Sequence, residues 1–289
     1  MVRAEPDNPS ATSAPSPGEA GAVGVVDMEG DVDEPRDWAS VTKLLVAMAV
    51  LVAVEEGTLT LDRPVGPPGA TVRHLLAHAS GLGPDSRAPL TAPGRRRIYS
   101  NAGYEMLGET LSDASGMPLT DYLHTGVVLP LGMTGTSLAP GASPASGARG
   151  PLRDLLALGA ELLRPTIVSP ATLAEATSVA FPGLAGVLPG YGRFDPCDWG
   201  LGFEVKDAKT PHWTGAHNAP TTFGHFGQSG SFVWVDPRAR LSCGALSDRA
   251  FGPWAKEAWP TLADAVVVEW ADGRTRSARA GHGDSEPVT

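Results

Sequence analysis

The sequence predicts a mixed α/β (α+β) protein, in which an antiparallel sheet flanked by helices is interrupted by an inserted helical domain. Segments rich in β-branched and aromatic residues occur only near the two ends of the chain, at 22–27, 199–206, 231–236 and 241–246. Helical periodicity dominates the region between them. We therefore expect the N-terminal and C-terminal strands to meet in one sheet.

This pattern also predicts the domain boundaries. A sheet domain should comprise residues 21–60 and 195–270, and a mainly helical domain should comprise residues 61–194. Residues 1–20 and 271–289 are polar and poor in large apolar side chains, which predicts disorder at both ends.

Local signals predict the elements in chain order. A helix should begin near Trp38 and end at Gly57, where glycine follows a long apolar run. Further helices are expected at 71–79, 101–115, 118–128, 152–163, 169–178 and 252–270, the fifth of these six with proline at its first helical position. Residues 181–198 should be irregular, and a turn at 236–240 should join the last two strands.

Composition and charge exclude several classes of protein. The 289 residues are 42% hydrophobic, which is enough to build one large domain or two closely packed ones. The net charge is −10, and the only basic cluster is Arg95–Arg97, which we expect in a solvated loop; nucleic acid is therefore not an expected partner. The apolar run Val46–Val54 is too short to span a membrane and ends at two glutamates.

The ends and the cysteines predict the compartment. The N-terminal segment lacks the apolar core of a secretory signal, so we expect a cytoplasmic protein. Cys197 and Cys243 show neither metal-binding nor redox spacing. Two free thiols suit a reducing compartment, although the sequence leaves a disulfide between them open.

The segment Trp38–Gly57 carries the first chemical signal. Ser40 and Lys43 lie three residues apart, so they share one helix face at the first turn, where unpaired backbone N–H groups can hold an oxyanion. Ser-x-x-Lys alone is a weak signal, because serine often begins helices. However, only four of the 22 basic residues are lysines, and a buried lysine, unlike arginine, can lose its proton and act as a base.

A second motif, Tyr99–Ser100–Asn101, precedes the helix at 101–115. A tyrosine near a lysine can act as a general base, either as a phenolate or by sharing its proton. The amide of Asn101 can orient a substrate carbonyl. Taken alone, the motif is also what a loop tyrosine beside a helix cap looks like.

A third motif lies in Gly224–Gly230, directly before the strand at 231–236. His225 and Gly227 would share one face of an edge strand, where glycine allows a substrate backbone to approach. The Gln228 N–H would then be a second oxyanion donor. The competing interpretation is a glycine-rich bulge with a structural histidine.

Together these motifs resemble those of the serine β-lactamase/penicillin-binding-protein superfamily, most closely its branch of class C β-lactamases, D,D-peptidases and β-lactamase-like esterases. Other stretches resemble this family too, among them TVRHLLAHASGL, LPLGM and GHFGQSGSFVWVDP. The resemblance covers about Ala22 to Trp270 and implies the β-lactamase/transpeptidase-like fold. It implies a Ser40 nucleophile, a Lys43–Tyr99 acid/base pair, substrate contacts at Asn101, His225 and Gly227, and an oxyanion hole from the N–H groups of Ser40 and Gln228.

The third motif departs from the β-lactamases of this branch, which have lysine where this chain has His225. A neutral histidine offers a substrate carboxylate a weaker and pH-dependent attraction. We therefore predict a serine hydrolase that cleaves a small ester or amide through a Ser40 acyl-enzyme, without a cofactor or a metal. The alternatives are an acyltransferase, a D,D-peptidase or β-lactamase with the same residues, or a non-catalytic binding protein of this fold.

Other candidate sites are weaker. His74 and His78 have the spacing of helical zinc ligands, but the glutamate of a His-Glu-x-x-His motif is absent. His212, Trp213 and His217 either line the pocket or only pack. The expected partner is a small ester, amide or lactam molecule, with neither nucleic acid nor a membrane involved. The sequence leaves the acyl group, the leaving group and the oligomeric state open.

Overall fold

The computed structural model describes residues 31–270. The strand predicted at 22–27 and the disorder predicted at 1–20 and 271–289 lie outside the described residues. Within residues 31–270, no helix is both long enough and apolar enough to cross a bilayer.

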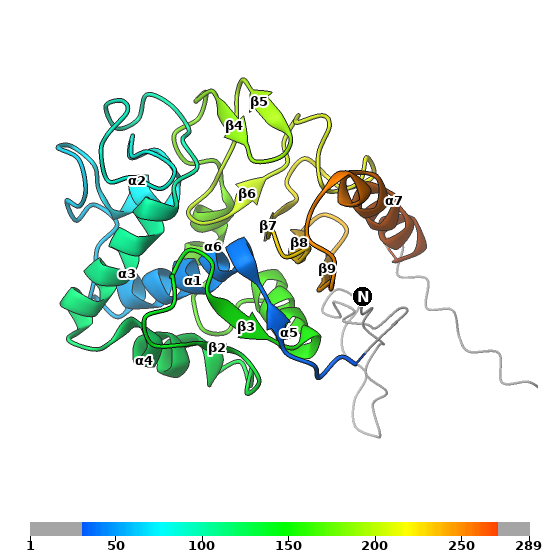
Figure 1. The fold of residues 1–289 in the computed structure, drawn as a ribbon, viewed down its shortest axis with the longest axis horizontal. Helices are drawn as coiled ribbons and strands as arrows, with labels where there is room; N and C mark the ends of the chain where they lie inside the picture. Colours follow the sequence, from blue (N-terminus) through cyan, green and yellow to red (C-terminus); the bar gives the residue numbers. More distant parts are fainter. Residues whose placement is uncertain (1–30, 271–289) are drawn as a thin grey trace, which may run out of the picture.

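Helix α1, Thr42–Glu55, runs through the middle of the molecule (Figure 1). Every residue from Thr42 to Ala53 is buried, as the all-round apolar pattern predicts. On one side α1 packs against three helical elements, α3 (Asn101–Ser115), α4 (Leu119–Leu123) and the π-helical segment η2 (His124–Val128). It also contacts strand β7 (Phe223–Phe226) of the main sheet, so α1 lies between the helices and the sheet.

The main sheet is antiparallel, with strand order β6–β7–β8–β9. Its strands are β6 (Glu204–Val205), β7 (Phe223–Phe226), β8 (Phe232–Asp236) and β9 (Leu241–Ala245). Both faces are buried, because Val233 and Val235 point to one core cluster and Phe232 and Trp234 to another. The turn expected at 236–240 joins β8 to β9. All four strands come from the C-terminal part of the chain.

Helices cover both faces of this sheet, which makes three layers. Helix α5, Leu152–Leu163, packs on β8 and β9 and shares a core cluster with Val233. Helix α7, Pro253–Trp270, places Trp259 against the opposite face, 5.0 Å from the Phe232 ring centroid. Helix α5 therefore packs with the sheet, although its residues lie within 61–194, the region predicted to form the helical domain.

Two small sheets lie outside the predicted strands. Strands β1 (Arg36–Asp37), β3 (Ala148–Gly150) and β2 (Ser137–Leu138) pair in the order β1–β3–β2, and β4 (Gly186–Leu188) pairs with β5 (Gly192–Phe194). Next to β1 and β3, the Trp38 N–H donates to Ala148 O at 2.9 Å. The Ala148 N–H in turn donates to Thr42 Oγ1 at 2.9 Å. These contacts hold the 145–150 segment against the start of α1.

The strand expected at 199–206 is shortened to β6. Trp199 instead forms an isolated bridge with Glu204, so the chain between them turns back on itself. Two glycines explain the turn. Gly202 has a φ of 102°, and a Cβ there would lie 2.3 Å from Ala47 of α1, while a Cβ on Gly200 would lie 2.2 Å from Ala176 O. The prediction of a continuous strand is therefore wrong at its first half.

The predicted helices are confirmed within a few residues. α3 and α5 have the expected bounds, and α6 spans Pro170–Thr177 with Ser169 as its cap. The helix expected at 71–79 is shorter, because α2 covers only Val72–Leu76. Ala77 and His78 form a turn after it, in which His78 has a φ of 54°.

The arginine triplet is divided between solvent and interior. Arg95 and Arg96 are exposed, as expected of a solvated loop, but Arg97 is buried. The expectation is therefore wrong for Arg97. Its guanidinium donates to four backbone carbonyls, those of Ala77 (2.6 Å), Cys197 (3.0 Å), Ala180 (2.7 Å) and Phe181 (3.2 Å).

Candidate active site

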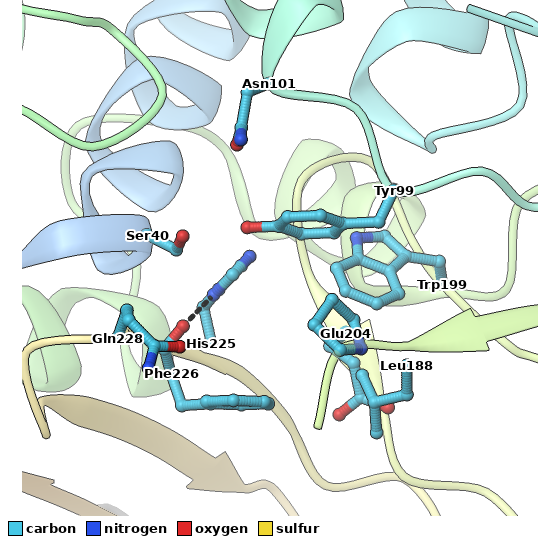
Figure 2. Close-up of a pocket in the computed structure, with 10 residues that line it drawn as sticks. Ser40, Tyr99, Asn101, Leu188, Trp199, Glu204, His225, Phe226 and Gln228 are labelled. Carbon is cyan, nitrogen blue, oxygen red and sulfur yellow. Dashed lines mark hydrogen bonds between the residues drawn. The ribbon is translucent and has the colours of Figure 1, made fainter. Parts of the chain in front are cut away.

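Ser40 lies in a short 3₁₀ turn, Ala39–Val41 (η1), which leads directly into α1. Ala39 has a φ of 43°, a region that residues other than glycine rarely adopt. The bend places Ser40 at the end of the buried helix, facing a cavity (Figure 2). The sequence predicts Ser40 in the first turn of the helix. In the structure Ser40 instead lies in the tighter 3₁₀ turn that immediately precedes α1.

The cavity has a volume of about 220 Å³. Its lining residues are Ser40, Tyr99, Asn101, Leu188, Pro189, Trp199, Glu204, His225, Phe226 and Gln228. The structure thus brings together five of the seven predicted site residues around one space (Figure 2). The other two, Lys43 and Gly227, are not among the lining residues.

Lys43 is completely buried beside Ser40. Its Nζ lies 2.7 Å from Asn101 Oδ1, 2.8 Å from Ala145 O and 3.5 Å from Ser40 Oγ. Burial lowers the pKa of Lys43 to about 7. A neutral amine has two N–H bonds and one lone pair. Because the oxygens of Asn101 and Ala145 can only accept, they take both N–H bonds, and the lone pair is left for the Ser40 hydroxyl.

Tyr99 packs over the same amine, with Lys43 Nζ 4.7 Å from the ring centroid. Burial raises the pKa of the Tyr99 phenol well above its usual value, although its contact with the Ser40 side chain acts in the opposite direction. At neutral pH Tyr99 is therefore a protonated phenol and Lys43 the better base. This arrangement favours Tyr99 as a proton carrier to the leaving group over the resting phenolate that the sequence also allows.

Asn101 is held at both ends of its amide. Its Oδ1 accepts from Lys43, and its Nδ2 donates to Asp85 Oδ1 at 2.7 Å. One amide N–H remains for a substrate, which is compatible with the predicted contact. The sequence does not reveal Asp85, because an exposed aspartate after a proline in a loop has no distinguishing local pattern.

His225, on β7, is buried and neutral. Its Nδ1–H donates to Phe226 O at 2.7 Å, since a carbonyl can only accept, so the Nε2 lone pair carries no proton. Burial, reinforced by Lys43, lowers the pKa of His225 to about 3. The Nε2 atom is buried and has no hydrogen-bond partner among the described residues. The sequence predicts a weak, pH-dependent attraction for a carboxylate, but at neutral pH this ring offers an anion no attraction.

Gly227 follows β7 and packs against the segment before Ser40. A Cβ there would lie 2.5 Å from both Trp38 O and Ser231 Oγ. Glycine thus lets the end of β7 approach the Ser40 turn, a different reason from the substrate backbone that the sequence suggests. Gln228, the next residue, lines the cavity beside Ser40 (Figure 2). The oxyanion hole from the N–H groups of Ser40 and Gln228 stays a prediction.

The remaining wall is apolar and aromatic, apart from Glu204. Its apolar side chains are Leu188, Pro189, Trp199 and Phe226. The Glu204 carboxylate is buried and accepts from Lys209 Nζ (2.7 Å), His212 Nε2 (2.9 Å) and Trp213 Nε1 (2.8 Å). The pairing with His212 and Lys209 holds the pKa of Glu204 below its usual value, although burial opposes this.

The other histidines that the sequence singles out do not line the cavity. His212 and Trp213 support Glu204 from behind, so they pack and do not line the pocket, and His217 is exposed, 3.0 Å from Asp264. His74 and His78 do not share a helix face, because α2 ends at Leu76. Their spacing therefore does not form the helical zinc pattern.

The profile of the Beta-lactamase family matches residues 22–267. The chain belongs to this family. The predicted resemblance to the serine β-lactamase/penicillin-binding-protein superfamily is confirmed, and the family's members are serine hydrolases, peptidases and esterases among them.

Individual members show how close the likeness is. A crystal structure of a beta-lactamase (Mb2281c) from Mycobacterium bovis is 52% identical, with a TM-score of 0.84, over 86% of this chain and 91% of that chain. It supports the β-lactamase/transpeptidase-like fold.

Two curated relatives match over a shorter stretch. The D-alanyl-D-alanine-carboxypeptidase/endopeptidase AmpH of Escherichia coli (strain K12) is 28% identical over 139 residues, 35% of this chain and 36% of the relative. Esterase EstB of Burkholderia gladioli is 34% identical over 142 residues, 33% of this chain and 36% of the relative. The matches span about a third of the length of these two relatives.

The pKa of Lys43 gives this Beta-lactamase family site a testable pH dependence. Only the neutral amine can accept the Ser40 proton, so kcat/KM should fall as the pH drops below about 7. The Asp85 carboxylate raises the pKa of Lys43 by attraction. Asp85→Asn is therefore expected to lower this pKa and move the acidic limb of the pH profile to lower pH. Kinetics with an uncharged ester across the acidic and neutral range will show the shift.

The control is Asp113→Asn, an exposed aspartate near the other end of α3. This variant should keep the wild-type limb. Because Asp85 is exposed, added salt should reduce the difference between wild type and Asp85→Asn. An acidic limb that stays in place or moves to higher pH in Asp85→Asn would show that this carboxylate does not act on Lys43.

Proposed function

We propose that this protein is a serine hydrolase that cleaves a small, uncharged ester or amide through an acyl-enzyme on Ser40. The observation that carries the proposal is the neutral His225 in the third motif. No lysine or arginine is among the residues that line the cavity, and Glu204 places a carboxylate in its wall. A substrate that carries a carboxylate, as β-lactams and peptide C-termini do, finds no cation there to bind it.

The size and surface of the cavity support a small acyl group. A volume of about 220 Å³ is below the range of drug-sized pockets. Trp199, Phe226 and Leu188 offer apolar contacts to such a group. The substrate class we favour is therefore a short, apolar acyl group on an uncharged alcohol or amine.

The reaction proceeds in two steps. Ser40 Oγ attacks the carbonyl carbon while its proton passes to the Lys43 lone pair, and the oxyanion is held by the N–H groups of Ser40 and Gln228. The bond to the leaving group then breaks, and Tyr99 gives its proton to the departing oxygen or nitrogen and takes up from Lys43 the proton that came from Ser40. Water next attacks the acyl carbon and gives up a proton to the same pair. The bond between that carbon and Ser40 Oγ breaks, Ser40 takes up the proton to regain its hydroxyl, and the carboxylic acid leaves.

Ser40→Ala is expected to abolish this activity. The test compares wild type and Ser40→Ala on p-nitrophenyl butyrate, on the p-nitrophenyl monoester of succinic acid and on a chromogenic cephalosporin. We expect wild type to hydrolyse the uncharged butyrate, with kcat/KM at least about tenfold higher than for either carboxylate-bearing substrate. A fluorophosphonate probe should label wild type and leave Ser40→Ala unlabelled.

His225→Lys is the matched variant for substrate charge, since it places a cation in the third motif. It should raise kcat/KM for the succinate monoester relative to the butyrate. Wild type that prefers the carboxylate-bearing substrates would contradict the proposed substrate class. Wild type that neither turns over an ester nor reacts with the probe would contradict the hydrolase itself, and substrate binding unchanged in Ser40→Ala would then favour a binding protein.

A further inference from the structure

His78 lies directly behind the catalytic tyrosine and is not part of the cavity wall. It is 1% exposed and follows α2 in a turn, where its φ of 54° departs from the helical range. Neither the proposed reaction nor the sequence motifs give it a role. Its ring centroid lies 4.6 Å from that of Tyr99, with the two planes tilted by 44°.

The polar atoms of His78 hold the chain on both sides of Tyr99. The Ile98 N–H donates to the His78 carbonyl oxygen at 2.9 Å, and the Ser100 N–H donates to His78 Nδ1 at 3.1 Å. One residue therefore binds the backbone before and after the tyrosine and also supports its ring. This arrangement fixes the direction of the Tyr99 side chain.

The hydrogen bonds around His78 continue through Ser100 to the start of α3. Ser100 Oγ accepts from the Gly103 N–H at 3.1 Å and donates to Gly83 O at 2.7 Å. Asn101 is the first residue of that helix, so the position of Ser100 also determines where α3 begins and therefore where Asn101 lies. His78 thus binds the backbone at Ile98 and Ser100, on either side of Tyr99, and is not among the residues that line the cavity.

The hydrogen bond determines the protonation of His78. Since the Ser100 N–H donates to Nδ1, that nitrogen is unprotonated and the proton is on Nε2. Burial, together with repulsion from Lys43, His225 and Arg97, lowers the pKa of His78 well below its usual value. The ring is therefore neutral and serves as a hydrogen-bond acceptor and packing surface, not as a charge.

We propose that His78 is a positioning residue, which holds Tyr99 against Ser40 and Lys43 through the backbone of Ile98 and Ser100. A role in packing alone would need only the shape of the ring. A positioning role needs an acceptor atom at the place of Nδ1. These two roles make different predictions for residues of similar size, because asparagine carries an acceptor oxygen on the same carbon, Cγ, and also tolerates a positive φ.

The inference rests on the proposed function for its main readout, which is hydrolysis of p-nitrophenyl butyrate by the full chain. His78→Leu keeps an apolar side chain but removes the acceptor, and we expect kcat to fall at least about tenfold with little change in KM, because misplaced catalytic groups slow the chemical step. His78→Asn should retain kcat to within a few fold. The rate of labelling of Ser40 by a fluorophosphonate should follow the same order.

The matched controls are His74→Leu and His74→Asn. His74 lies on α2, and its Nδ1 contacts Thr71 Oγ1 at 2.9 Å, outside the site. Both controls should keep wild-type kcat. Thermal unfolding of each variant separates a loss of kcat from a loss of folded protein.

Three outcomes would overturn the inference. His78→Leu could keep wild-type kcat, His78→Asn could lose as much kcat as His78→Leu, or kcat could follow the melting temperature across all variants. If His78→Leu does not fold, His78→Gln replaces it, because its amide lies one bond too far along to accept from the Ser100 N–H. His78→Asn should then be more active than His78→Gln. Inactive wild type would instead contradict the proposed function.

Discussion

Lys43→Met is expected to reduce kcat/KM by about 10²–10⁴-fold, the usual contribution of a general base. Methionine has nearly the length of lysine and suits a buried site, but it has no lone pair that can take the Ser40 proton. The fully buried position of Lys43, with both N–H bonds of the neutral amine directed to Asn101 and Ala145, is the physical reason for this expectation. Steady-state kinetics and the rate of Ser40 labelling by a fluorophosphonate measure the loss.

Two further variants identify the chemistry behind this loss. Lys43→Arg should be as inactive as Lys43→Met, because a guanidinium stays charged and cannot accept the proton. Lys206→Met, a half-buried lysine that donates to Asn218 O at 2.6 Å outside the site, should behave like wild type. Lys43→Met with a tenth or more of wild-type kcat/KM would indicate that Tyr99 is the base.

The candidate reacting groups could be named from the sequence because each motif has a fixed local spacing. Ser40 and Lys43 are close in the chain, so helix geometry alone brings them together. Joining them to Tyr99, Asn101 and His225 required the family resemblance, since these motifs come from separate elements. The structure agrees with that grouping, and five of the seven predicted residues line one cavity.

The supporting residues could not be predicted, because their signal exists only in three dimensions. Ala145 contributes a backbone oxygen to Lys43 from 102 positions away, and a backbone atom leaves no trace in the sequence. Asp85 and His78 contact the second motif only in the folded chain, at Asn101 and Ser100, and each lies in a loop or turn with no distinguishing local pattern. His78 lies within the stretch HLLAHASGL, whose regular helical pattern hides that the helix stops two residues before it.

The same distinction holds for the fold. Helices α3 and α6 have side-chain caps at Ser100 and Ser169, and α5 has a clear apolar periodicity, so their bounds are nearly as predicted. Strands β1 to β5 are only two or three residues long and exist because a distant segment pairs with them. A strand of that length has no period to detect.

Arg97→Met is expected to destabilise the protein by about 3–5 kcal/mol, because hydrogen bonds to a charged group contribute about 1.5–3 kcal/mol each and are not additive. Burial lowers the pKa of Arg97 to about 10, so the guanidinium is charged at neutral pH. It joins Ala77, the 180–181 turn and Cys197, three segments that are far apart in the sequence. Methionine would leave the carbonyls of all three segments without their donor.

Denaturant unfolding of the purified chain measures this effect, provided that the slope of the transition is unchanged between variants. The neighbours supply matched controls, since Arg95→Met and Arg96→Met remove exposed arginines and should change the free energy of unfolding by less than about 0.5 kcal/mol. Arg97→Lys should recover part of the loss, because an ammonium keeps the charge and three donors but lacks the planar fork. If Arg97→Met unfolds within about 1 kcal/mol of wild type, water must replace the guanidinium at these carbonyls, and Arg97 would not hold the three segments together.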